Sequence, residues 1–311
     1  MASPRLRTIA LLLAIVLLPV APHAAPAKAA GSTAATLSAP LPPLIGDEES
    51  ALIEPEDTVL DVAYGHRLGF DNVARANPGV PVWIPEPGTV VRLPTREIVP
   101  EVPPRGLVIN IPEMRLYDFT RRGPPEVFAI AIGDEIDPSL HGAFRIGRKR
   151  ENPAWHVPKA IREEKPDLPA VVPPGPDNPL GDRWMTIGTT SYGIHGTNNN
   201  WSIGRTATHG CIRLYNDEMR RLYDHVPSGT PLEIVYEPVK LGADGDAIYV
   251  EAHPDVYGRV ADLLAAPLAE LDARGLTPYV DLDALRQVVE EAKGVPVRIG
   301  TLPPSSEAAV R

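Results

Sequence analysis

The chain has 311 residues and a formal net charge of −10 at pH 7, and its length gives room for two modest domains. The excess of acidic residues argues against binding to nucleic acid through a basic surface, because such a surface must replace the counterions of the phosphates. The 37 prolines and 25 glycines favour short strands and turns, but they are too few to indicate a wholly disordered chain.

Residues 1–29 are predicted to be a signal peptide. Arg5 and Arg7 precede an apolar run over Ile9–Val20, and small residues with Ala-x-Ala spacing follow around Ala27. This three-part pattern is typical of secretory signals, and the run is shorter than the about 20 apolar residues that span a bilayer. We therefore expect an exported protein. The sequence leaves open whether the segment is cleaved or kept as an anchor.

Residues 30–48 are rich in Ala, Ser, Thr and Pro and are predicted to be a linker. The next segment, residues 49–98, has the pattern of a small α+β module. Thr58 can cap a first short helix, and a second helix through Phe70 would stop at Asn77-Pro78-Gly79. A strand is predicted over residues 89–93, and a weaker one around residues 51–53.

This module resembles a LysM domain. The resemblance rests on the string EDTVLDVAYGHRLGFDNVARANPGV, which begins at Glu56, and on TVVRLP, which begins at Thr89. It implies a strand, two helices and a strand, and binding to the N-acetylglucosamine-containing glycan of cell walls. A small helical cap without a ligand is the alternative, because sugar contacts cannot be identified in one sequence.

Residues 104–237 have the period-two pattern of a β domain. Leu107, Ile109 and Ile111 share one face of the first strand, and further short strands are predicted over residues 115–119, 127–132, 143–146 and 232–236. The segment 152–181 holds eight prolines, so we expect a long crossing loop there. Residues 238–311 are predicted to form a helical extension, with helices through residues 256–264 and 282–292, the second capped by Asp281.

The single cysteine of the chain lies in the segment richest in reactive side chains. Cys211 follows His209 and Gly210, and His195 lies 16 residues upstream. A histidine next to a cysteine can take the thiol proton, or can stabilise the thiolate as an imidazolium. A zinc site built from His195, His209 and Cys211 is the alternative, but no C-x-x-C or H-E-x-x-H spacing accompanies these residues. We therefore expect a cysteine nucleophile without a metal or other cofactor.

The same segment resembles the signature of the YkuD-type L,D-transpeptidases. Their motif is a histidine followed, after a variable spacer, by Ser or Thr and then His-Gly-Cys; here it is His195 and then Thr208-His209-Gly210-Cys211. With the LysM-like module, the chain is similar to the periplasmic ErfK, YbiS, YcfS and YnhG group of Gram-negative bacteria. The resemblance implies a mainly β fold, with a YkuD-type β-sandwich as the catalytic domain.

The resemblance also implies a role for each residue of the motif. Cys211 would be the acylated nucleophile, His195 its general base, and Gly196 would orient the His195 ring through its backbone carbonyl. Three residues, Thr208, His209 and Gly210, would shape the pocket and the oxyanion site. As a separate hypothesis, Arg213 would hold a substrate carboxylate, because a guanidinium can bind a carboxylate through two hydrogen bonds.

The reaction implied is acyl transfer on the tetrapeptide stems of peptidoglycan, through a thioester on Cys211. The acceptor stays open: the amine of a second stem would give a 3-3 cross-link, a lysine would attach an envelope lipoprotein, and water would give L,D-carboxypeptidation. An amidase that releases lipoproteins is a close alternative. A non-catalytic scaffold that only binds peptidoglycan is the other class of function that the sequence leaves open. The oligomeric state cannot be predicted.

Overall fold

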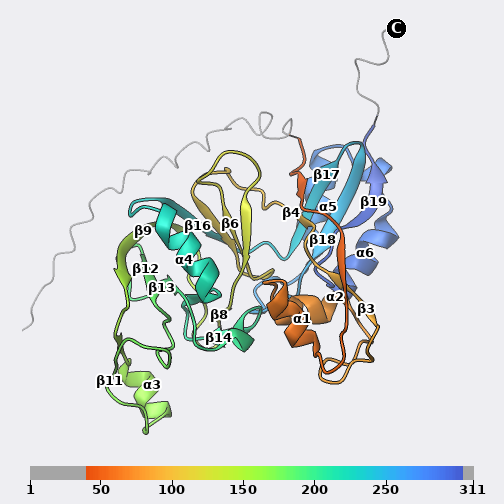
Figure 1. The fold of residues 1–311 in the computed structure, drawn as a ribbon. Coiled ribbons are helices and arrows are strands. Elements are labelled where there is room, and N and C mark those ends of the chain that lie inside the picture. The colour runs from red at the N-terminus through yellow and green to blue at the C-terminus, as the bar shows by residue number, and fades with distance from the viewer. Residues whose placement is uncertain (1–39, 304–311) are drawn as a thin grey trace, which may run out of the picture. The chain divides into compact units, whose positions relative to one another are not determined.

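The structure is a computed structural model, and it describes residues 40–303 (Figure 1). The predicted signal peptide and the first ten residues of the predicted linker lie outside this range. Within the described range, no helix is long and apolar enough to cross a membrane.

The segment 49–98 has the order strand, helix, helix, strand that its sequence predicts. The elements are β2 (Glu49–Leu52), α1 (Val59–Gly65), α2 (Phe70–Ala76) and β3 (Val90–Leu93), and β2 pairs antiparallel with β3. Thr58 caps α1, because its hydroxyl accepts from the backbone N–H of Asp61 while the Asp61 carboxylate accepts from the Thr58 N–H. The two helices pack on the strands through a small apolar cluster that includes Ile53, Val73 and Val91.

The prediction of a linker over residues 30–48 is wrong for its described end. Leu44–Ile45 form β1, which pairs with β4 (Glu97–Ile98), and Leu41 is buried in the apolar core of the C-terminal extension. The apolar side chains of this stretch are too few for a periodic pattern, so their burial could not be predicted from the sequence.

Residues 104–237 form an eight-stranded sheet with several smaller elements around it. The strand order is β15-β13-β12-β9-β16-β5-β6-β7. The strands of this sheet are β5 (Leu107–Asn110), β6 (Arg115–Asp118), β7 (Glu126–Ala129), β9 (Gly142–Glu151), β12 (Arg183–Ile187), β13 (Gly193–His195), β15 (Ile212–Arg213) and β16 (Pro231–Val235). Beside it lie a two-stranded pair, β8 (Ile132–Gly133) with β14 (Thr206–Thr208), the 3-10 turn η1 (Asn200–Ser202) and helix α4 (Asn216–His225).

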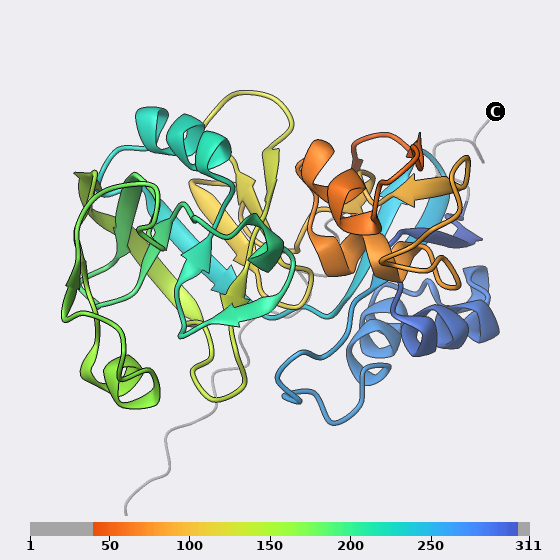
Figure 2. The same cartoon turned by 60° about the horizontal axis from the view of Figure 1, so that its bottom comes forward.

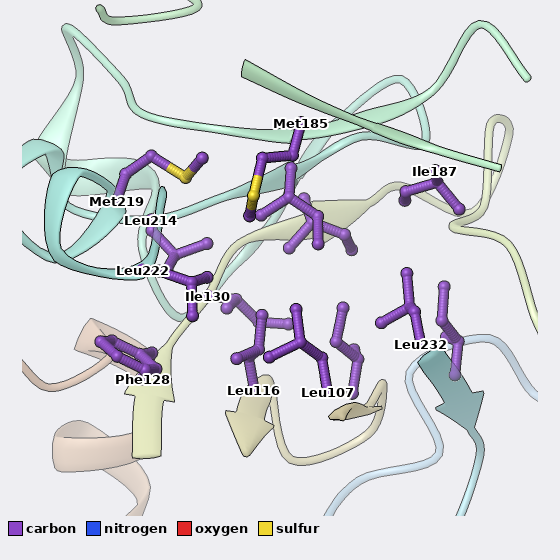
Figure 3. Packing of buried hydrophobic residues seen from close by; sticks show 14 of the residues in the cluster. Leu107, Leu116, Phe128, Ile130, Met185, Ile187, Leu214, Met219, Leu222 and Leu232 are labelled. Carbon is purple, nitrogen blue, oxygen red and sulfur yellow. The ribbon is translucent and has the colours of Figure 1, made fainter. Parts of the chain in front are cut away.

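The sheet curls around one apolar core, so that β12 faces β16, β5 and β6 across it (Figure 3). Figure 3 shows Met185 and Ile187 of β12 on one side and Leu107, Leu116 and Leu232 on the other, all buried in the same cluster. The predicted mainly β fold is confirmed. The proline-rich segment 152–181 carries only short elements, namely β10 (Trp155–His156), α3 (Lys159–Glu164) and β11 (Val171–Val172).

The extension over residues 238–311, which was predicted to be helical, is only partly helical. The extension contains a three-stranded sheet of β17 (Val239–Asp244), β18 (Ala247–Ala252) and β19 (Val297–Thr301). Two helices, α5 (Ala265–Ala273) and α6 (Leu282–Glu291), pack on the sheet (Figure 2). The 3-10 turn η2 (Thr277–Tyr279) separates them along the chain. Only the second predicted helix is present, with Asp281 as its cap; residues 256–264 are not helical.

Candidate active site

Parallel pairing of β13 with β15 brings His195 and Cys211 together. Ile194 lies level with Ile212 and His195 with Arg213, so Cys211, which directly precedes β15, lies level with Gly193. The Gly193 backbone acts on the Cys211 thiol and opposes the rise in its pKa that burial causes, in agreement with this register. Residues two apart on a strand share a face, and neighbouring strands are about 4.8 Å apart, so His195, Cys211 and Arg213 project from the same face.

The His195 ring is held on two sides. Its Nδ1 lies 2.6 Å from the carbonyl oxygen of Gly196, and its plane stacks on the Trp184 indole, with ring centroids 5.5 Å apart and an interplanar angle of 14°. Since a carbonyl can only accept, Nδ1 is the nitrogen that carries the proton in the neutral ring, and Nε2 keeps a free lone pair. This tautomer is the one a general base needs. The Gly196 contact agrees with the role that the family resemblance implies for Gly196, whereas the stacking on Trp184 was not predicted.

Burial keeps both reactive groups neutral. It raises the pKa of the Cys211 thiol, although the Gly193 backbone and the Arg213 charge act in the opposite direction. Burial, and after it the charge of Arg213, lowers the pKa of His195 to about 3, against the effect of the Gly196 and Leu180 backbone. At pH 7 the pair is therefore a thiol beside a neutral imidazole. Of the two activation modes that the sequence left open, this geometry favours proton transfer during the reaction over a preformed ion pair.

A tight turn presents the cysteine. The Thr208 hydroxyl donates to the Cys211 carbonyl oxygen at 2.6 Å, which closes the turn from Thr208 to Cys211. Gly210 has a φ of +90°, and a Cβ there would lie 2.5 Å from the Tyr192 ring. Only glycine fits this position, because the left-handed backbone and the aromatic neighbour both exclude a side chain. Thr208 and Gly210 thus lie where the sequence analysis placed them, as supports of the nucleophile.

His209 pairs with acidic residues at the surface. Its Nδ1 lies 2.9 Å from a carboxylate oxygen of Asp137, and its Nε2 lies 3.9 Å from Glu164. These partners tie the turn to the loop at residues 133–139 and to α3. The contacts fit a supporting role for His209, as the sequence analysis proposed.

Arg213 brings a positive charge with spare hydrogen-bonding capacity to the site. Burial lowers the pKa of its guanidinium, and the buried Nε atom has no hydrogen-bond partner among the described residues. Because a buried cationic donor without a partner is costly, this atom is suited to receive an anionic group. A carboxylate of the substrate is the group that the sequence hypothesis names.

One residue that was not predicted from the sequence clamps the loop after His195. Asn216, the first residue of α4, accepts from the Thr197 backbone N–H at 3.0 Å and donates to the Thr197 carbonyl at 2.6 Å. This double contact holds the loop that carries Gly196. The only signal in the sequence was an Asn at the start of a helix, a common choice that does not indicate a site.

Comparison with known proteins identifies the family of the chain. Residues 104–234 match the L,D-transpeptidase catalytic domain family, YkuD. The chain is 34% identical to "Probable L,D-transpeptidase ErfK/SrfK" of Salmonella typhimurium, over 85% of this chain and 91% of that protein. It is also 34% identical to "Probable L,D-transpeptidase YbiS" of Escherichia coli K12, over 86% of this chain and 94% of that protein.

Among solved structures, the chain is similar to the catalytic domain of an Enterococcus faecium L,D-transpeptidase. The alignment covers 42% of this chain and 96% of that domain, at 21% identity and a TM-score of 0.33. The identity of about one third to two curated relatives extends over nearly their whole length. The chain therefore belongs to the L,D-transpeptidase family of enzymes.

Proposed function

We propose that this enzyme transfers an acyl group from a peptidoglycan tetrapeptide stem through a thioester on Cys211. The observation that carries the proposal is the pairing of β13 with β15, which places the His195 ring and the Cys211 thiol on one face. The Gly196 contact supports it, because it leaves Nε2 of His195 free to accept the thiol proton.

In the first half-reaction, His195 takes the proton of Cys211 while the sulfur attacks the carbonyl carbon of the third stem residue, a diamino acid. The tetrahedral intermediate collapses as the bond to the fourth residue breaks, and His195 returns the proton to the leaving amine. D-alanine departs and a thioester remains. Backbone N–H groups of the turn at Cys211 would stabilise the oxyanion, and Arg213 would hold a carboxylate of the stem.

In the second half-reaction an amine attacks the thioester carbonyl, and His195 accepts the proton of the amine; the bond from the carbonyl carbon to sulfur then breaks, and His195 returns the proton to Cys211. A side-chain amine of another stem would give a 3-3 cross-link, whereas a lysine would attach an envelope lipoprotein. Water would turn the same intermediate into a carboxypeptidase product. The thioester conserves the energy of the cleaved peptide bond, so none of these transfers needs ATP.

The place of action that fits this substrate is the periplasm. The support for this part of the proposal is the signal-like pattern of residues 1–29, together with a substrate that lies outside the cytoplasm.

Incubation of the protein with purified tetrapeptide muropeptides tests the proposal. We expect mass spectrometry of the intact protein to show a thioester-sized adduct on Cys211, together with free D-alanine in solution. A Cys211→Ala protein should show neither, while it still folds. A cross-linked dimer or a tripeptide then distinguishes transpeptidation from hydrolysis. If folded, reduced protein forms no adduct and releases no D-alanine, the scaffold alternative is preferred.

We further propose that the module at residues 49–98 binds the glycan strand. An exposed aromatic surface supports this: Trp83 is 55% exposed, Trp201 is 60% exposed, and their ring centroids are 6.5 Å apart. Trp83 also stacks on Phe70, and the neighbouring Ile84 is 85% exposed. Flat apolar rings of this kind offer stacking surfaces for sugar rings. Trp201 lies on the loop between His195 and Cys211, so a bound glycan strand would pass close to the active site.

Replacing Trp83 with alanine is expected to weaken binding to insoluble peptidoglycan by about tenfold, the usual effect of losing one exposed aromatic anchor. The measurement is a pull-down with purified sacculi over a range of protein concentrations. Tyr279→Ala is the matched control, since Tyr279 is an exposed aromatic residue of the extension, 44% exposed. Equal binding by the two variants would count against this surface.

A further inference from the structure

The C-terminal extension reaches the catalytic domain through Tyr257. This residue follows β18 in the segment that was wrongly predicted to be helical, and its ring packs against the apolar core of the catalytic sheet. Its hydroxyl donates to the carbonyl oxygen of Gly133 at 2.8 Å and accepts from the backbone N–H of Ser139 at 3.2 Å. One phenol group therefore bridges both ends of the loop at residues 133–139.

The Tyr257 ring is itself held in place. It stacks on Tyr236, with centroids 5.9 Å apart, and its backbone N–H donates to the Tyr236 hydroxyl at 2.9 Å. The Tyr236 hydroxyl in turn donates to Asp255. The guanidinium of Arg259 lies over both rings. A ring that is immobilised in this way can keep the loop at residues 133–139 in place, whereas a mobile surface contact could not.

The loop that Tyr257 closes lies against the turn before the nucleophile. Gly133 pairs with Thr208 in the β8–β14 ladder, and the Asp134 N–H donates to the Thr208 carbonyl at 2.9 Å. A Cβ on Gly133 would lie only 2.9 Å from the Cα of Gly210. Asp137, at the middle of the loop, contacts His209. Each of the three residues before Cys211 is thus in contact with this loop.

We propose that Tyr257 is a positioning residue for acyl transfer at Cys211, an inference that rests on the proposed function. Its hydroxyl fixes the loop at residues 133–139, and the loop fixes the turn whose backbone N–H groups face the developing oxyanion. The extension is therefore part of the catalytic apparatus. Loss of the hydroxyl loosens the oxyanion site and leaves the Cys211 thiol and the His195 base in place.

The test compares two reactions of the same thiol in Tyr257→Phe. Acylation by a tetrapeptide muropeptide passes through an oxyanion, whereas alkylation by iodoacetamide does not. We expect kcat for D-alanine release to fall by about three- to tenfold with little change in KM, because the hydrogen bonds to Gly133 and Ser139 are both lost while the loop keeps its other contacts. The rate of alkylation is expected to equal that of the wild type.

Tyr249→Phe is the matched control, because it makes the same change on β18, where the ring faces Arg96 instead of the loop. Tyr249→Phe should keep the wild-type rates of D-alanine release and of alkylation. A Tyr257→Phe protein with wild-type kcat would overturn the inference, and so would one in which acylation and alkylation fall by the same factor. A wild-type protein that is alkylated but releases no D-alanine would overturn the proposed function, and this inference with it.

Discussion

Replacing His195 with alanine is expected to lower the rate of Cys211 acylation at pH 7 by a factor of about 10²–10⁴, the usual contribution of a general base. The reason is that burial raises the pKa of the Cys211 thiol, so few molecules hold a thiolate without a neighbouring base. The measurement is the burst of D-alanine released from a tetrapeptide muropeptide. His66→Ala is the control, since His66 is an exposed histidine at the end of α1.

The acylation rate of His195→Ala should approach that of the wild type as the pH rises, because hydroxide then removes the thiol proton in place of the missing imidazole. In the wild type, the pKa of about 3 for His195 keeps the ring neutral, and able to act as a base, well below pH 6. Alkylation of wild-type Cys211 by iodoacetamide should therefore rise steadily with pH. A plateau between pH 5 and 7 would instead show a preformed thiolate–imidazolium pair, and would contradict the neutral resting state.

Local signals in the sequence were sufficient to predict where the helices with a side-chain cap begin. Thr58 and Asp281 both accept backbone N–H groups at the starts that were predicted, because capping involves only residues within one turn. The predicted helix through residues 256–264 is wrong. There the Asp255 carboxylate accepts from the N–H groups of Arg259 and Val260, and Pro254 and Gly258 flank the turn that results. Apolar spacing alone did not reveal this competing local structure.

The candidate site could be predicted in part. The Thr208-His209-Gly210-Cys211 run and His195 are a sequence pattern, so their proximity was expected before the β13–β15 pairing was seen. The supports of the site come from distant parts of the chain and carry no local signal. Asn216 and Tyr257 each act through two hydrogen bonds to backbone atoms, and the tertiary fold decides which backbone atoms they meet.

The same limit applies to a buried charge cluster that joins three parts of the chain. Lys240 of β17 is 4% exposed, and its ammonium contacts Glu113 of the catalytic domain and, at 3.3 Å, Glu251 of β18. It also donates to the carbonyl of Ile98, the last residue of the N-terminal module, while the Ile98 N–H donates to Glu251 at 2.6 Å. His253 lies 2.6 Å from Glu251. Burial lowers the pKa of His253 to about 3, so this ring is neutral.

Replacing Lys240 with methionine is expected to lower the free energy of unfolding by about 3–5 kcal/mol at pH 8, because it leaves two buried carboxylates without their cation. Burial already raises the pKa of Glu113 to about 7, with Lys240 opposing this shift. A raised pKa means stability that is complete below the unfolded value of about 4.5 and is lost as the pH rises through about 7. The loss in Lys240→Met should thus be smaller at pH 5, where the carboxyls can be protonated. Urea unfolding at pH 5 and pH 8 measures this loss. Lys159→Met is the control, because Lys159 is an exposed lysine of α3 and its replacement should lower the free energy of unfolding by less than about 0.5 kcal/mol. An equal loss in Lys240→Met at pH 5 and pH 8 would contradict this prediction.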